Sequence, residues 1–348
     1  MAQHEGARHG WMVARCTTET YGGGIKEFDP EVVLGHRVAP MEIIVHDTVT
    51  QMAALLERPV TERPGVLREV LAPLEGMFSL MGIPLRAGEP GQWDAVSMHQ
   101  ASASSGFRLD RDDDRYAAAL ARMAEADVLG QVEHALREAW NYQAGVTPTI
   151  GHADTLHVVT VLGDPDDEHL VDRSGGYFGT GGIPGYIHLV VWPTEQTVDR
   201  LAYCAVHELN HNLRYANIQW DPNTVTVGEW VVAEGLAEAY VREIHGEHAM
   251  HPWPTALSGA ELDAAYAKIT SDIDLAGMQH LMPYVHGDAT ARRLGAEPVG
   301  LPDHAGYDVG RRIVDTHLNA TGFSAAASTT LPVSEILANA GVATHPNV

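Results

Sequence analysis

Cysteine is almost absent from this sequence of 348 residues, which contains only Cys16 and Cys204. Two cysteines exclude a scaffold built on several disulfides, and they also exclude a zinc site made of four cysteines. Cys204 falls in an apolar part of an expected helix, which indicates a buried free thiol.

Long apolar runs are absent too. The strand-like runs Val158–Leu162 and Ile187–Trp192 are far shorter than the roughly 20 residues that a membrane-spanning helix needs. The N-terminus has no apolar segment behind a basic start, so we expect no secretory signal. These absences predict a cytoplasmic protein without a membrane partner.

Basic side chains are scarce: 22 lysines and arginines stand against 46 aspartates and glutamates, for a formal net charge of −24. Such a surface repels the phosphate backbone, so we expect no nucleic-acid partner. The same charge favours solubility and would attract cationic peptides to a cleft.

Residues 1–150 predict an α/β region of unknown role. The local patterns are a strand at Met41–His46, helices at Val49–Glu57 and from Pro64, and a loop at Gly88–Gly106. A helical region follows from Asp112 to about Gln143, and we expect it to be broken near Gly130.

The chain changes character near residue 150, where we predict a boundary with a second domain, residues 151–348. Apolar, β-branched segments at Leu156–Leu162 and Gly185–Trp192 predict strands. The glycine-rich loop between them, Gly163–Pro184, lacks the residues of a phosphate-binding loop and suggests a flexible flap beside a cleft. Helical patterns dominate after Pro193, so the fold class is α+β.

The segment HELNH, residues 207–211, carries the clearest chemistry. Thr194 or Thr197 would cap a helix running through it. Four residues turn a helix by about 400° and advance it by about 6 Å, so His207 and His211 project from one face and can grip one zinc ion. Glu208 is placed to reach a water on that ion without coordinating it, which is the logic of the HExxH motif.

A catalytic zinc normally has three protein ligands, so a third must come from elsewhere. Thr226 and Glu229 form a capping-box pattern that starts another helix. Glu234 and Glu238 share one face of it among small and apolar residues, where unpaired carboxylates are costly. We assign Glu234 as the third ligand and Glu238 as the carboxylate that orients a ligand histidine.

Other histidine-rich segments make weaker sites. His4 and His9 are five residues apart, which separates them around a helix. Three histidines near the end of the second helix come close to a reversed motif with Glu247, but the spacing is one residue short, and we interpret them as surface histidines: His245, His248 and His251.

HELNH followed by AEGLAEAY at residues 233–240 resembles the gluzincin metallopeptidases and, more closely, the bacterial family of predicted zinc-dependent proteases. The segments Gly306–Gly310 and Leu331–Leu337 support the resemblance, which covers about residues 150–340. It implies zinc ligands at His207, His211 and Glu234 and a general base at Glu208.

The resemblance further implies a zincin-like metallopeptidase domain, in which a small sheet lies over the active-site helix and a helical subdomain follows. Gly185–Trp192 is the expected edge strand lining the cleft. Tyr307 is the expected donor to the oxyanion, with His304 as the alternative.

The leading hypothesis is a zinc metallopeptidase that hydrolyses amide bonds in peptides. One alternative keeps the metal but acts on a small-molecule amide or biosynthetic intermediate. Another is a non-catalytic zincin scaffold used for binding, in which a protein side chain would fill the fourth zinc position. The residues leave open the oligomeric state and the physiological metal, since two nitrogens and one carboxylate also hold other divalent ions.

Overall fold

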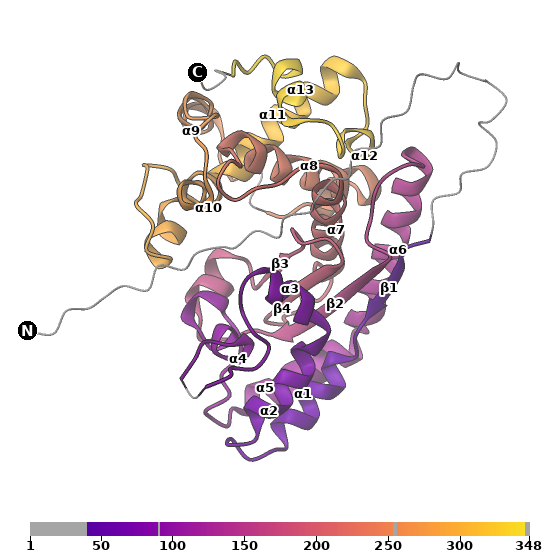
Figure 1. The fold of residues 1–348 in the computed structure, drawn as a ribbon, viewed down its shortest axis with the longest axis vertical. Helices are drawn as coiled ribbons and strands as arrows, with labels where there is room; N and C mark the ends of the chain where they lie inside the picture. Colours follow the sequence, from indigo (N-terminus) through magenta and orange to yellow (C-terminus); the bar gives the residue numbers. More distant parts are fainter. Residues whose placement is uncertain (1–39, 90, 253–255, 345–348) are drawn as a thin grey trace, which may run out of the picture.

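The computed structural model describes residues 40–89, 91–252 and 256–344 (Figure 1). The predictions made for His4, His9 and Cys16 lie outside these residues. Within them, no helix has the length and apolar character needed to span a membrane. Cys204 is buried and free, as predicted.

A mixed four-stranded sheet lies at the middle of the molecule (Figure 1). Its strands are β1 (Glu42–Val45), β2 (Thr155–Leu162), β3 (Tyr177–Thr180) and β4 (Tyr186–Val191), in the order β1-β2-β4-β3. β1, β2 and β4 run parallel to one another, and β3 pairs antiparallel with β4. β2 and β4 are largely buried, which explains their continuous apolar sequences. The sheet thus takes strands from both sides of residue 150, and the domain division there remains a prediction.

The predicted edge strand is wrong. Gly185–Trp192 corresponds to β4, which lies between β2 and β3, so the edge strand on this side of the sheet is β3. β3 belongs to the segment that we expected to be a flexible flap, which also contains the π turn η4 (His169–Arg173). With only four residues, one of them Gly179, β3 is too short to show alternation in the sequence.

Helices of the N-terminal part pack around the sheet and below it in Figure 1. They are α1 (Thr48–Leu56), α2 (Arg63–Leu71), η2 (Ala72–Leu74), α3 (Glu75–Leu80), α4 (Ala95–His99), η3 (Ser102–Ser104), α5 (Asp114–Glu125) and α6 (Val128–Val146). Pro64 lies in the first turn of α2, as predicted. The predicted loop Gly88–Gly106 instead contains α4, which Asp94 caps by accepting from the backbone N–H of Ser97. The break between α5 and α6 falls at Asp127, whose φ is 48°.

The helices after β4 gather at the other end of the molecule (Figure 1). They are α7 (Leu201–Asn217), α8 (Val227–His245), η5 (Glu247–Ala249), α9 (Gly259–Ser271), α10 (Met278–Arg293), α11 (Ala305–Thr321), α12 (Ala325–Ser328) and α13 (Val333–Asn339). α7 and α8 carry the segments singled out above.

Only one of the two predicted caps is correct. The Thr226 side chain accepts from the backbone N–H of Glu229 and so caps α8. α7 begins at Leu201 with Arg200 at the cap position, and neither threonine caps it. The Thr197 hydroxyl instead accepts from the backbone N–H of Thr194 and donates to the carbonyl of Trp192. Thr197 therefore fixes the turn between β4 and α7.

A buried ion pair joins the C-terminal part of α7 to the start of α8. Arg214 donates from Nε and Nη2 to the two carboxylate oxygens of Glu229, at 2.7 and 2.8 Å. Its Nη1 donates to the carbonyls of Thr329 and Leu331. Arg214 is completely buried, and these partners satisfy its guanidinium donors in place of water. The ion pair therefore fixes the position of α7 relative to α8.

α8 and α11 approach each other through glycines. A Cβ added to Gly235 would lie 2.3 Å from the carbonyl of Gly310, and one added to Gly310 would lie 2.2 Å from the carbonyl of Val231. Backbone contact at this distance tolerates no side chain on either helix. This explains the glycine inside α8 and the glycine at the end of the Gly306–Gly310 segment.

We predict that Gly235→Ala destabilises the protein by about 2 kcal/mol, although alanine favours a helix, because the methyl group would force α8 and α11 apart. Gly145→Ala is the matched control, since nothing lies within 4 Å of its added Cβ, and it should leave stability equal or slightly higher. Urea unfolding of both variants measures the difference. An unchanged midpoint for Gly235→Ala would contradict the packing argument.

Candidate metal centre

Three buried donor atoms converge between α7 and α8. Nε2 of His207 lies 3.0 Å from Nε2 of His211. Oε2 of Glu234 lies 3.1 Å from the first of these nitrogens and 3.4 Å from the second. The structure thus brings together the three side chains that the sequence suggested as a ligand set.

These separations suit one small cation. Ligand atoms about 2.0–2.1 Å from a tetrahedral zinc ion are about 3.3 Å from one another. Two imidazole nitrogens and one carboxylate oxygen are also donors that zinc accepts. The residues present therefore fit a zinc ion, and His207, His211 and Glu234 would hold it.

The charges of the cluster favour the same conclusion. Burial by itself would lower the pKa of His207, but Glu234 and Glu238 outweigh burial and raise this pKa well above its ordinary value. Burial by itself would raise the pKa of Glu234, but His211 and His207 hold it well below its ordinary value. The centre of the cluster therefore stabilises positive charge, which a proton or a metal cation can supply.

Trp230 orients the carboxylate of Glu234 from one turn earlier in α8. Its indole Nε1 donates to Oε1 of Glu234 at 2.9 Å. The other oxygen, Oε2, is left facing both histidines. Because Trp230 and Glu234 are four residues apart on one helix, this contact is local, and their spacing alone could have suggested it.

Glu238 lies on the opposite side of the His207 ring. Its Oε1 accepts from Nδ1 of His207 at 2.8 Å, the arrangement expected for a carboxylate that orients a ligand histidine. The same carboxylate accepts from the ring and the backbone N–H of His251. The prediction that His251 is a surface histidine is therefore wrong: only 5% of its surface is exposed.

His207, Glu238 and His251 also form a group that could hold a metal. Their contacts of 2.5 and 2.8 Å are hydrogen-bond lengths, and an ionised carboxylate can only accept. Both Nδ1 atoms are therefore donors in this arrangement. We interpret the group as a hydrogen-bond network that supports the first cluster.

Glu208 lies under the edge strand. A Cβ on Gly179 would be 2.5 Å from Cγ of Glu208, and one on Gly181 would be 2.4 Å from the Glu208 carbonyl. The glycines thus let β3 and the residues after it press directly against this turn of α7. Burial raises the pKa of Glu208, which brings the carboxylate closer to the range of a general base.

Tyr307 reaches the cluster from α11. Its ring stacks on that of His207 with the centroids 6.3 Å apart. Burial, followed by the nearby Glu234, raises the pKa of Tyr307 well above its ordinary value, so that its hydroxyl keeps its proton. His304, the alternative, sits at the start of α11 and points Nε2 toward the carbonyl of Arg173 at 3.3 Å.

Sequence reasoning missed His286 on α10. Its ring centroid lies 5.9 Å from those of both Trp230 and Tyr307, which places it at the border of the cluster. Gly287 follows it with φ 82° and contacts the backbone of Pro302, so the kinked helix can approach the start of α11. No spacing in the sequence relates His286 to the HELNH segment.

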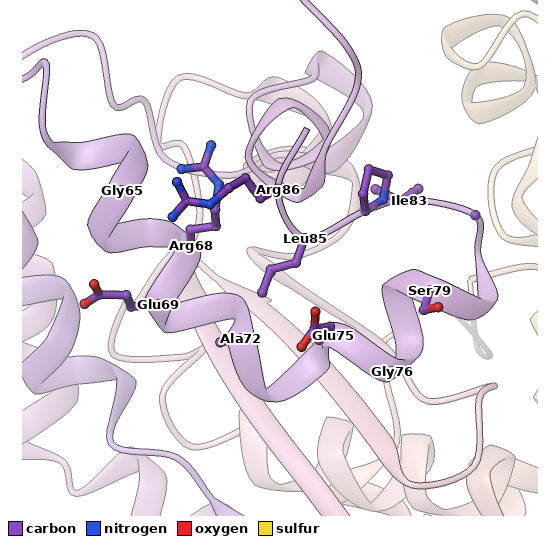
Figure 2. Close-up of a pocket in the computed structure, with 12 residues that line it drawn as sticks. Gly65, Arg68, Glu69, Ala72, Glu75, Gly76, Ser79, Ile83, Leu85 and Arg86 are labelled. Carbon is purple, nitrogen blue, oxygen red and sulfur yellow. The ribbon is translucent and has the colours of Figure 1, made fainter. Parts of the chain in front are cut away.

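A surface hollow of about 950 Å³ lies away from these residues, between α2, α3 and the segment 82–86. Arg68 and Arg86 are among the residues that line it (Figure 2). None of the residues of the metal cluster lines this hollow, so it contributes nothing to their chemistry.

Residues 131–338 match the family described as "Predicted Zn-dependent protease (DUF2268)". The chain belongs to this family. The match covers the strands β2 to β4 and the helices from α7 to α13 except the last residue of α13, and so includes every residue of the cluster. The family resemblance seen in HELNH and AEGLAEAY is confirmed.

Similarity to one curated protein covers more of the chain than the family match does. "Uncharacterized protein YjfC" of Bacillus subtilis (strain 168) is 29% identical over 303 residues, which cover 87% of this chain and 99% of that protein. No solved structure matches.

Zinc should raise the thermal stability of the metal-free protein. A ligand at 100 times its dissociation constant stabilises a folded protein by about 2.7 kcal/mol when it binds only the folded state. We expect His211→Ala to lose most of this zinc-induced shift in Tm, and His134→Ala, a substitution of an exposed histidine on α6, to retain it. Equal shifts in wild type and His211→Ala would contradict the proposed ligand set.

Proposed function

We propose that this chain is a zinc-dependent peptidase in which Glu208 acts as general base. The observation that carries the proposal is the convergence of Nε2 of His207, Nε2 of His211 and Oε2 of Glu234, with Glu208 on the same helix beside them. Membership of a family of predicted zinc-dependent proteases supports it independently.

The number of ligands favours a catalytic metal over a structural one. Across residues 40–89, 91–252 and 256–344, the group of His207, His211 and Glu234 includes no fourth histidine, cysteine or carboxylate. Structural zinc sites have four protein ligands, whereas catalytic sites have three and keep one position open. This argues against the non-catalytic scaffold.

Glu208 and Tyr307 supply the remaining chemistry. Zinc in such a site lowers the pKa of water from 15.7 to about 7 and polarises a carbonyl. Glu208 would take the proton from the attacking water and deliver it to the leaving amine, for which its raised pKa is suited. Tyr307 would donate its hydroxyl proton in a hydrogen bond to the developing oxyanion.

The edge strand favours a peptide substrate over a small amide. The N–H of Trp192 donates to the carbonyl of Gly176, so these two residues form a hydrogen-bonded pair of the antiparallel ladder. Such pairs alternate with non-hydrogen-bonded pairs, and Gly179, three residues further along β3, belongs to the second kind. The backbone N–H and C=O of Gly179 therefore point away from β4. These groups can pair with an extended peptide, as in other cases of strand addition. Because Gly179 lies against Glu208, a peptide paired there would run past the general base.

We predict that Glu208→Gln retains zinc but lowers peptide hydrolysis by at least about 100-fold, since an amide cannot accept the proton. Zinc content measured by mass spectrometry and cleavage of a peptide library measure the two effects. Glu195→Gln, an exposed position before α7, is the control and should retain full activity.

Full activity in Glu208→Gln would eliminate the general-base assignment. The alternative substrate class would be supported instead if the wild-type protein bound zinc and hydrolysed small amides but cleaved no member of the peptide library.

A further inference from the structure

His251 holds the carboxylate of Glu238 at two points. Its ring Nδ1 lies 2.5 Å from Oε1 of Glu238, and its backbone N–H donates to Oε2 at 3.0 Å. Glu238 is completely buried, so water cannot replace these donors. Among the described residues, His251 thus gives this carboxylate two hydrogen bonds and His207 gives it one more.

These contacts determine the protonation of both rings. Oε1 of Glu238 is shared by the Nδ1 atoms of the two rings, at 2.8 Å from His207 and 2.5 Å from His251. An ionised carboxylate only accepts, so His207 must donate from Nδ1. Nε2 is then the nitrogen left to face His211 and Glu234, and it can offer its lone pair to a metal that takes the place of a proton there.

His251 is in turn fixed from two other elements. Its ring stacks on Tyr177 of β3, with centroids 5.3 Å apart and an angle of 27° between the planes. The preceding carbonyl, that of Met250, accepts from Nη1 of Arg200 at the start of α7 at 3.0 Å. A continuous series of contacts thus runs from the edge strand through His251 and Glu238 to His207.

We propose that His251 is a positioning residue for the metal centre: by fixing Glu238, it fixes the tautomer and orientation of the ligand His207. The inference rests on the proposed zinc site. It differs from a second metal site at His207, Glu238 and His251, in which a metal would have to replace the Nδ1 proton of His207 and release it.

Three substitutions of His251, to alanine, glutamine and asparagine, distinguish the effect of losing the Nδ1 donor from the effect of losing side-chain volume. An asparagine side chain places an amide near the position of Nδ1, whereas glutamine places it near Nε2. All variants keep the backbone N–H. We expect zinc affinity to fall about tenfold in His251→Ala and His251→Gln, at the lower end of the range for partners of ligand histidines, and to recover in His251→Asn. His248→Ala, at an exposed position in η5, should bind as wild type.

Zinc affinity is measured by competition with a chromophoric chelator, and the visible spectrum of the Co²⁺-substituted proteins reports the coordination geometry. We expect His251→Ala to shift the Co²⁺ bands and His251→Asn to restore them. Circular dichroism confirms that each variant is folded.

Three outcomes would overturn the inference while leaving the proposed function intact: wild-type affinity and spectrum in His251→Ala, equal losses in the asparagine and alanine variants, or binding of a second zinc that His251→Ala removes. Failure of the wild-type protein itself to bind zinc would refute the proposed function instead.

Discussion

Two buried carboxylates on one face of α8 impose the constraint on which the site depends. Glu234 and Glu238 are 4% and 0% exposed, and charges at this depth require compensation from opposite charges or donors. The histidines of α7 meet this requirement in part, with His207 lying between the two carboxylates. A divalent cation between His207, His211 and Glu234 would complete the compensation, so the cost of burying Glu234 is itself an argument for a metal.

The surrounding fold holds this arrangement rigid. Arg214 and Glu229 lock α7 to α8, and the contact of Gly235 with Gly310 brings α11 and Tyr307 close. The sheet then covers α7 from the other side, because the glycines of β3 and the following turn let the backbone touch Glu208. Three separate elements, α8, α11 and β3, therefore meet at one turn of α7, and the glycine contacts among them leave no room for a side chain.

Periodicity within single helices could be predicted from the sequence, and contacts between distant segments could not. The spacing of His207 and His211 and the cap at Thr226 depend only on helix geometry. His251 escaped prediction because its burial depends on the direction of the chain after Gly246, where φ is 86°. β3 escaped because four residues with a glycine carry no alternation, so the edge of the sheet was assigned to β4 instead.

Anomalous X-ray diffraction at the zinc absorption edge, on crystals of zinc-loaded protein, tests the central claim most directly. The account predicts a peak about 2.0–2.2 Å from Nε2 of His207, Nε2 of His211 and a carboxylate oxygen of Glu234. A peak between His207, Glu238 and His251, or the absence of any peak within bonding distance of Glu234, would contradict it.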